Sequence, residues 1–195
     1  MRLYLSPGAC SLADHIALME AGLAFEVAKV DLKAKTVEGG GDYLKVNPKG
    51  YVPALALDDG QVLTENIAIL SWIADRAPAL APTGDLARYR LLEALAYIST
   101  ELHKAFKPFF TPGADEAQKT QARQQIERRL GLLAGRVEDG YLFGREATVA
   151  DAYLFVMLRW AKANGVSIPG PLAAYFDRMA ARPAVRQALA AEGLA

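Results

Sequence analysis

The first 76 residues carry short apolar runs and one clear helical period. Residues 2–5 are mostly apolar and end at Pro7, which predicts a short strand. Over residues 10–21 the apolar side chains recur at helical spacing until Gly22, a residue that commonly ends helices. Residues 25–30 alternate and predict a second strand. Two strands joined by a helix form a βαβ unit, whose strands we expect to be parallel.

The next two apolar runs predict a hairpin followed by a helix. Residues 52–57 and 61–63 flank the turn 58–60 (DDG), and an Asp-Gly step between apolar runs is typical of a β-hairpin. A helical period covers residues 67–74, and Asn66 is a candidate capping residue in front of it. The order is therefore βαβ followed by ββα, which is the order of a thioredoxin-type domain.

The chain changes character after a segment rich in proline. Residues 77–84 (APALAPTG) hold two prolines and a glycine, so we expect them to form a linker. Only helical periods follow. The sequence therefore predicts a mixed α/β, thioredoxin-like domain over residues 1–76 and an all-helical domain over residues 85–195.

Three helices of the second part have distinct patterns. One long helical period covers residues 85–110, and a second helix is predicted from about residue 115 to 137. Thr148 and Asp151 stand three positions apart, in the pattern of a capping box with Asp in place of Glu or Gln. The apolar run behind them, residues 152–160, is nearly unbroken, which predicts a helix buried on most sides.

Composition and charge argue against several classes of protein. Of the 195 residues, 52% are hydrophobic and 23% charged, which suits a folded chain with a large core. Basic and acidic residues both number 22, so no basic excess indicates nucleic-acid binding. No stretch approaches the ~20 apolar residues of a membrane helix. With one cysteine and two histidines, we expect no disulfide, no metal site, and a cytoplasmic protein that contacts neither membrane nor nucleic acid.

Cys10 is the first candidate for chemistry, because it stands at the first turn of a predicted helix. An ordinary thiol has a pKa of about 8.5, so only about 3% is in the reactive thiolate form at neutral pH. The free N–H groups and the dipole of a helix N-terminus favour an anion, which would lower the pKa of the thiol. The alternative interpretation is a small buried hydrophobic residue, the commoner role of an isolated cysteine.

Three other positions have two interpretations each. Pro53 begins a predicted strand, where a proline is either an ordinary edge residue or a cis proline with a role. Glu65 and Asn66 stand at a helix N-terminus, which either binds a carboxylate or is simply capped. His103 and Lys104 lie in the long helix. If that helix packs across the first domain, His103 can assist a thiolate; otherwise the two residues form a surface pair.

Five segments, spread over nearly the whole chain, resemble the beta class of bacterial glutathione S-transferases. They are LYLSPGACSLADHIAL, KVNPKGYVPAL, LTENIAIL, ISTELHKAF and ATVADAYLF. Each motif is short, but their order and spacing together match the family. The resemblance implies the fold of that family, in which a thioredoxin-like domain precedes an all-helical one.

The resemblance also implies roles for individual residues. Cys10 would lie at the glutathione sulfur and could form a mixed disulfide with it, and His103 would stand near the same sulfur. The Val52–Pro53 peptide bond would be cis, with the Val52 backbone pairing with the cysteinyl part. The other implied glutathione-binding residues are Glu65 and Asn66 at the γ-glutamyl end, Lys35 and Lys104 near the glycyl carboxylate, and Thr100 one turn before His103.

The implied activity is conjugation of reduced glutathione, the co-substrate, to small hydrophobic electrophiles. The apolar candidates for the electrophile pocket, which are alternatively core residues, are Phe106, Phe109, Phe110 and Trp160. The family is dimeric, so a homodimer is implied, with each active site borrowing from the partner near the start of the long helix. Two positions depart from the family: Asn66 replaces a serine or glycine, and Ala96 replaces an asparagine that often faces the partner's glutathione.

Two other functions fit the same residues. A thiol–disulfide oxidoreductase resembling a single-cysteine glutaredoxin would use Cys10 to form a glutathione mixed disulfide. A non-catalytic protein would bind glutathione or hydrophobic ligands without turning them over. The sequence identifies neither the electrophile nor the dominant activity.

Overall fold

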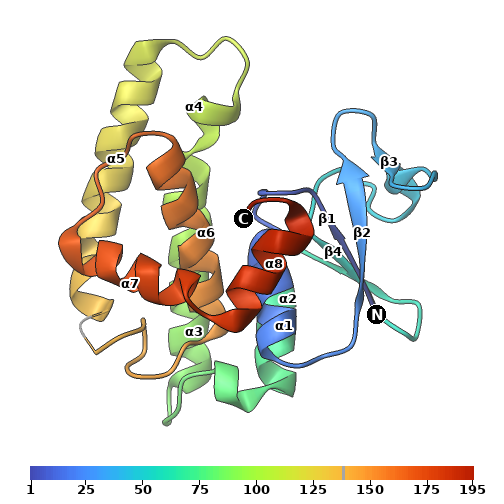
Figure 1. The fold of residues 1–195 in the computed structure, drawn as a ribbon, viewed down its shortest axis with the longest axis horizontal. Coiled ribbons are helices and arrows are strands. Elements are labelled where there is room, and N and C mark those ends of the chain that lie inside the picture. Colours follow the sequence, from blue (N-terminus) through green and yellow to red (C-terminus); the bar gives the residue numbers. More distant parts are fainter. Residues whose placement is uncertain (138) are drawn as a thin grey trace.

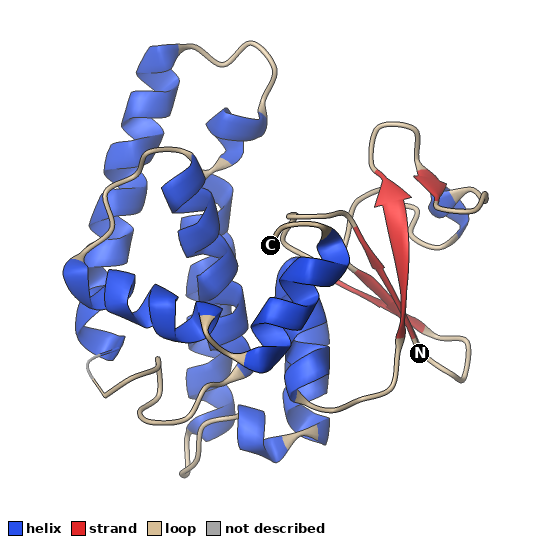
Figure 2. Cartoon of the chain, in the orientation of Figure 1, coloured by secondary structure: helices blue, strands red, loops and turns tan. Residues whose placement is uncertain are grey.

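A five-stranded mixed sheet stands beside a larger group of helices in the computed structural model, which describes residues 1–137 and 139–195 (Figures 1 and 2). Its strands are β1 (Arg2–Leu5), β2 (Glu26–Asp31), β3 (Thr36–Val37), β4 (Ala54–Ala56) and β5 (Val62–Thr64). Their order is β3-β2-β1-β4-β5. β1 and β2 are parallel, as predicted, and β4 and β5 form the predicted antiparallel hairpin. The short strand β3 was not predicted, because two residues are too few to show an alternating pattern.

The two faces of the sheet pack against different partners. Successive side chains of a strand point to opposite faces. Leu3 and Leu5 therefore join the main core with α1 (Leu12–Glu20) and α2 (Asn66–Arg76). Tyr4 faces the other side, where Tyr43 of the 3₁₀-helix η1 (Tyr43–Lys45) centres a smaller cluster. The predicted βαβ-ββα order of a thioredoxin-like domain is thus confirmed.

The remaining elements of the described chain are helical. They are η2 (Pro78–Leu80), α3 (Ala87–Tyr97), the π-helix η3 (Ile98–His103), α4 (Lys107–Phe110), α5 (Glu116–Ala134), η4 (Gly135–Val137), α6 (Val149–Ala163), α7 (Gly170–Ala180) and α8 (Pro183–Glu192). The prediction of a single long helix over residues 85–110 is wrong, because this segment is divided into α3, η3 and α4. None of the helices in the described ranges is long and apolar enough to cross a membrane.

One hydrophobic core runs from the sheet into the helical part. α1 packs on α2, α6 and α8, so it lies between the sheet and the helices that follow it by more than a hundred residues (Figure 1). Most side chains of α6 are buried, as its apolar run predicted. The two parts of the chain therefore share a core.

The capping box in front of α6 is present and buried. The carboxylate of Asp151 accepts hydrogen bonds from the backbone N–H of Thr148 at 2.7 Å and of Leu142 at 2.9 Å. The hydroxyl of Tyr175 on α7 donates to the same carboxylate at 3.1 Å. Asp151 therefore joins the start of α6 to the preceding loop and to α7. A second capping box begins α5, where Asp115 accepts from the N–H of Gln118, but this one is exposed.

We predict that the two capping boxes contribute very differently to stability. Asp151→Ala leaves several buried donors without an acceptor, and we expect it to lower the free energy of unfolding by about 3 kcal/mol or more. In Asp115→Ala, water can replace the lost carboxylate as acceptor, so we expect the free energy of unfolding to fall by only about 1 kcal/mol. Urea unfolding followed by circular dichroism, at one protein concentration, measures both. Equal losses in the two variants would contradict the structural role assigned to Asp151.

Candidate functional site

A cleft of about 690 Å³ gathers most of the predicted site residues. It lies where the end of the sheet domain faces α3 and η3. Its lining includes these predicted residues: Cys10, Val52, Pro53, Glu65, Asn66, His103 and Lys104. Residues from three distant stretches of the chain therefore meet at one place. The peptide bond between Val52 and Pro53 is cis, as the family resemblance implied.

A second cavity of about 550 Å³ adjoins the cleft and shares some of its walls. Cys10, Val52 and His103 line both spaces. The second cavity is mainly apolar, and Phe110 and Trp160 form part of its wall. A group bound beside Cys10 would therefore be in reach of both a polar cleft and an apolar cavity.

The thiol of Cys10 is in a different electrostatic state from the one the sequence suggested. Burial raises the pKa of the Cys10 thiol to about 12, and the nearby Asp14 adds to the effect. The backbone N–H groups of Cys10 and Ser11 oppose this rise but are outweighed. α1 begins at Leu12, with Ser11 as its N-cap, so Cys10 precedes the helix instead of lying within its first turn. The expectation that the helix would lower the pKa of the Cys10 thiol is therefore wrong.

Asp14 and Asn66 form a buried pair behind Cys10. The Asn66 side-chain amide donates to the backbone carbonyl of Cys10 at 2.9 Å and to Asp14 Oδ2 at 3.0 Å. Asp14 is fully buried, and this burial raises the pKa of its carboxyl group well above the usual value. The amide of Asn66 therefore ties α2 to the segment of Cys10. Asp14 gave no signal in the sequence, because it occupies an ordinary helix position.

Glu65 lies at the mouth of the cleft in an unusual backbone conformation. Its φ of 74° is in the left-handed region, which costs a residue with a side chain of order 1–3 kcal/mol. Its carboxylate accepts hydrogen bonds from Lys49 Nζ and from the Tyr51 hydroxyl, and these two contacts lower the pKa of Glu65. A charged carboxylate is thus held at the N-terminus of α2, where the sequence placed a ligand-binding group.

His103 is the last residue of the π-helix η3. Its Nδ1 atom lies 2.7 Å from the hydroxyl of Tyr153 on α6, and the Trp160 ring packs edge-on against the imidazole. Burial, together with the charge of Lys104, lowers the pKa of His103 to about 4. The imidazole is therefore neutral at pH 7. π-helical turns occur frequently at functional sites.

The loop before Cys10 is anchored by the far end of the chain. The Gly8 N–H donates to Glu192 at 2.9 Å, and the Gly8 carbonyl accepts from Trp160 Nε1 at 2.9 Å. The other oxygen of the Glu192 carboxylate lies 2.8 Å from His15 Nδ1, in the core. His15 is thus a packed core residue. These contacts set the position of Cys10 relative to α6 and α8.

Four predicted site residues do not line either space. Phe106 is fully buried, because it continues the apolar stripe of Ile98 and Leu102, and Phe109 packs on it. Thr100 is exposed and donates to the Ala96 carbonyl. Lys35 Nζ donates to the Gly50 carbonyl at 2.6 Å. Phe106 is therefore a core residue, the alternative given for it, whereas the roles of Phe109, Thr100 and Lys35 stay predictions.

The lining residues that the sequence reasoning missed include Tyr51, Ser99 and Tyr153. Ser99 takes the place expected for Thr100. In a π-helix the hydrogen bonds run from residue i to i+5, so each turn holds more residues than in an α-helix. The side chain one turn before His103 is therefore that of Ser99, four positions earlier. Tyr153 lies within the apolar run of α6, where an aromatic residue looks like core. No residue pattern distinguished it.

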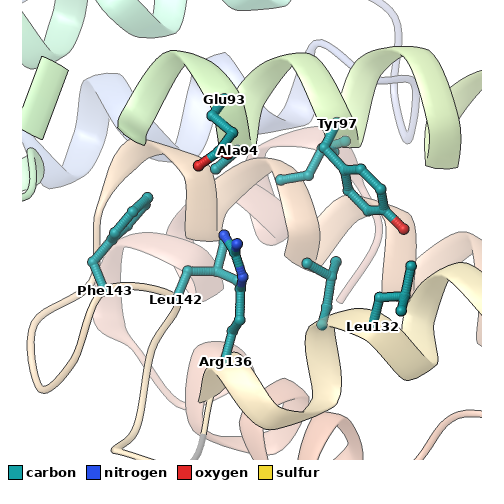
Figure 3. A pocket seen from close by; sticks show the side chains of 9 residues that line it. Glu93, Ala94, Tyr97, Leu132, Arg136, Leu142 and Phe143 are labelled. Carbon is teal, nitrogen blue, oxygen red and sulfur yellow. The ribbon is translucent and has the colours of Figure 1, made fainter. Parts of the chain in front are cut away.

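A smaller cavity of about 200 Å³ lies elsewhere, between α3 and the end of α5. Figure 3 shows Arg136 reaching from η4 toward Glu93, with Tyr97 and Leu132 nearby. None of the predicted site residues lines it. Within residues 1–137 and 139–195, no cluster of three or more His, Cys, Asp or Glu side chains could hold a metal ion.

Comparison with known proteins agrees with this geometry. Residues 9–76 match the family model of the glutathione S-transferase N-terminal domain, and residues 97–183 match that of the C-terminal domain. The chain is 48% identical to glutathione S-transferase GstA of Escherichia coli O157:H7, with 100% of both chains covered.

Solved structures are similar over the whole chain. A sphingomonad glutathione S-transferase complexed with glutathione is 49% identical, with a TM-score of 0.93 and 100% of both chains covered. The bacterial beta class glutathione S-transferase of Sphingomonas chungbukensis is 51% identical, with a TM-score of 0.91 and the same coverage.

We predict that the Cys10 thiol reacts slowly in the ligand-free protein. With a pKa of about 12, roughly 10⁻⁴ of it is thiolate at pH 8, against about a quarter of an ordinary thiol. Because a more basic thiolate is intrinsically more nucleophilic, we expect alkylation by iodoacetamide to be about 100-fold slower than for free cysteine. Intact mass against time measures the rate, and the urea-unfolded chain is the control. A rate that levels off between pH 5 and 8 would show a lowered pKa instead.

Proposed function

Because the chain belongs to the glutathione S-transferase family, we propose that its cleft binds reduced glutathione and that the adjoining cavity receives a small hydrophobic electrophile. The observation that carries the proposal is that Cys10 and His103 line both spaces. A glutathione sulfur beside them would face the polar cleft on one side and the apolar cavity on the other. The family assignment and the similarity to a beta-class structure confirm the resemblance found in the sequence.

The proposed orientation of glutathione follows the charges around the cleft. The carboxylate of Glu65 suits the amine of the γ-glutamyl group, and the first N–H groups of α2 suit its carboxylate. The backbone of Val52 would pair with the cysteinyl part, beside Cys10. Lys104, on the opposite wall, would attract the glycyl carboxylate. Lys35 is engaged with Gly50 and would have to leave that carbonyl to take part.

The chemistry would take place at the glutathione sulfur. The glutathione thiol loses its proton to solvent, the thiolate attacks an electrophilic carbon, and a carbon–sulfur bond forms as the leaving group departs with its electron pair. Two groups can stabilise the thiolate: the neutral imidazole of His103 and the protonated thiol of Cys10, both as hydrogen-bond donors. Phe110 and Trp160 would contact the apolar part of the electrophile.

The raised thiol pKa argues for conjugation over the oxidoreductase alternative. Thiol–disulfide exchange requires an attacking thiolate, and burial keeps the Cys10 thiol protonated in the ligand-free protein. We further propose that the protein works in the cytoplasm, where glutathione is kept reduced.

We predict that His103→Ala lowers the conjugation of a chlorinated aromatic acceptor by about 100-fold. Gln61→Ala, in the exposed turn between β4 and β5, serves as the control and should keep full activity. Absorbance of the conjugate measures both rates. Turnover of a small disulfide that exceeds conjugation and disappears in Cys10→Ser would instead favour the oxidoreductase. Retention on immobilised glutathione without either activity would favour a binding protein.

We also propose that two copies pair through the faces of α3 and α5. Large apolar side chains are exposed there: Tyr89 at 67% and Leu132 at 71%, with Leu86 at 56% just before α3. Leu132 also lines the cavity of Figure 3, so this face is both apolar and hollowed. Leu86 and Tyr89 lie near the start of the long helical segment, where the family resemblance placed the partner. Ala96 has no side-chain amide to offer the partner's glutathione.

We predict a homodimer at micromolar concentration by light scattering. The double variant Tyr89→Glu with Leu132→Glu introduces two charges into the proposed apolar interface and should yield monomers. Val27→Glu, at a 39% exposed apolar residue on β2, is the matched control and should remain dimeric. A monomeric wild-type protein would contradict the proposed dimer.

A further inference from the structure

The contact between His103 and Tyr153 raises the question of which group donates the proton. A neutral imidazole carries one N–H, on either Nδ1 or Nε2. If Nδ1 is protonated, it donates to the tyrosine oxygen, and Nε2 presents a lone pair to the cleft. If Tyr153 donates to Nδ1, Nε2 presents an N–H group. The two arrangements give His103 opposite roles at a bound sulfur.

The geometry of the contact favours donation by Tyr153. The 2.7 Å separation is short for an N–H donor, whose usual distance is about 2.9–3.0 Å, and fits an O–H donor better. The Ser99 hydroxyl lines the same cleft and is another polar group near the phenol. An unprotonated imidazole nitrogen is a stronger acceptor than a serine hydroxyl, so the phenol proton points to Nδ1.

We propose that Tyr153 is a positioning residue: its hydroxyl donates to Nδ1 and holds His103 as the Nε2–H tautomer, with that N–H available to the glutathione sulfur. The inference rests on the proposed function for the identity of the sulfur, but the tautomer itself does not depend on it. Nε2 makes no hydrogen bond within the described residues, whereas Nδ1 is engaged, so the free ring nitrogen is the one left for the cleft.

The proposed tautomer makes His103 a hydrogen-bond donor to the thiolate. An imidazole whose pKa is lowered to about 4 is a poor base at pH 7, so abstraction of the glutathione proton is not the role that suits it. A neutral N–H donor in a partly buried site stabilises the thiolate without adding a full charge. Tyr153 itself need not touch the substrate for this effect.

The two histidines of the chain provide an internal comparison. His15 Nδ1 lies 2.8 Å from a Glu192 carboxylate oxygen, which in its ionised form only accepts hydrogen bonds, so Nδ1 of His15 carries a proton. Among the described residues, the Nε2 atom of His15 is buried without a hydrogen-bond partner. We therefore expect a proton on Nδ1 of His15 and on Nε2 of His103, so the two rings differ in the nitrogen that carries it.

Two-bond ¹⁵N–¹H correlation spectra of the ligand-free protein test the proposal directly. Contacts to the Phe25 ring assign the His15 signals, and contacts to the Trp160 ring assign those of His103. We expect the pattern of a protonated Nε2 for His103 at pH 7. A protonated Nδ1 on His103 in the wild-type protein would overturn the proposal, whether or not the protein conjugates glutathione.

The variant Tyr153→Phe removes only the hydroxyl. We expect the His103 pattern to change toward a mixture of tautomers and the His15 pattern to stay unchanged. We expect kcat for conjugation to fall about two- to tenfold, which corresponds to the net free energy of one hydrogen bond. Tyr141→Phe, which removes a hydroxyl that accepts from the Arg182 guanidinium, is the matched control and should change neither readout. An unchanged His103 pattern in Tyr153→Phe would also overturn the proposal.

Discussion

The buried carboxylate of Glu192 is the contact on which the arrangement of the two parts depends. One oxygen meets His15 on α1, and the other accepts from the N–H of Gly8, 184 residues earlier in the chain. A carboxylate enclosed in a core is costly unless it is paired and hydrogen-bonded, so these partners must be in place together. α8 can therefore dock only where α1 and the loop before Cys10 have already taken their native positions.

The same contact connects folding to the site. Gly8 is held on one side by Glu192 and on the other by the indole of Trp160, which itself lines the apolar cavity and packs against His103. A shift of α6 or α8 would therefore move Cys10 and the cavity wall together. The site is formed at the junction of the sheet and the helices, and neither part contains it alone.

Charge is distributed across the cleft according to burial. The groups deepest in it are neutral at pH 7: the Cys10 thiol, the His103 imidazole and the Tyr153 hydroxyl, because burial disfavours their charged forms. The groups at the rim keep their charge, and the carboxylate of Glu65 is held by Lys49. In the proposed function, such a cleft would stabilise an anion at its base through hydrogen-bond donors and bind the charged ends of glutathione at its edge.

The sequence by itself determined the order of strands and helices, the buried α6 with its capping box, and the segments that meet at the cleft, because these depend on local periodicity and on motifs. Only the tertiary structure decided the direction of the Cys10 pKa shift and the π-helical turn that brings Ser99, not Thr100, into the cleft lining. It also decided the positions of Asp14 behind Cys10 and of Tyr153 beside His103. Each of these depends on which distant side chains surround a group. Burial and neighbouring charge are properties of the packed chain, and they outweigh what a residue's place beside a helix would suggest.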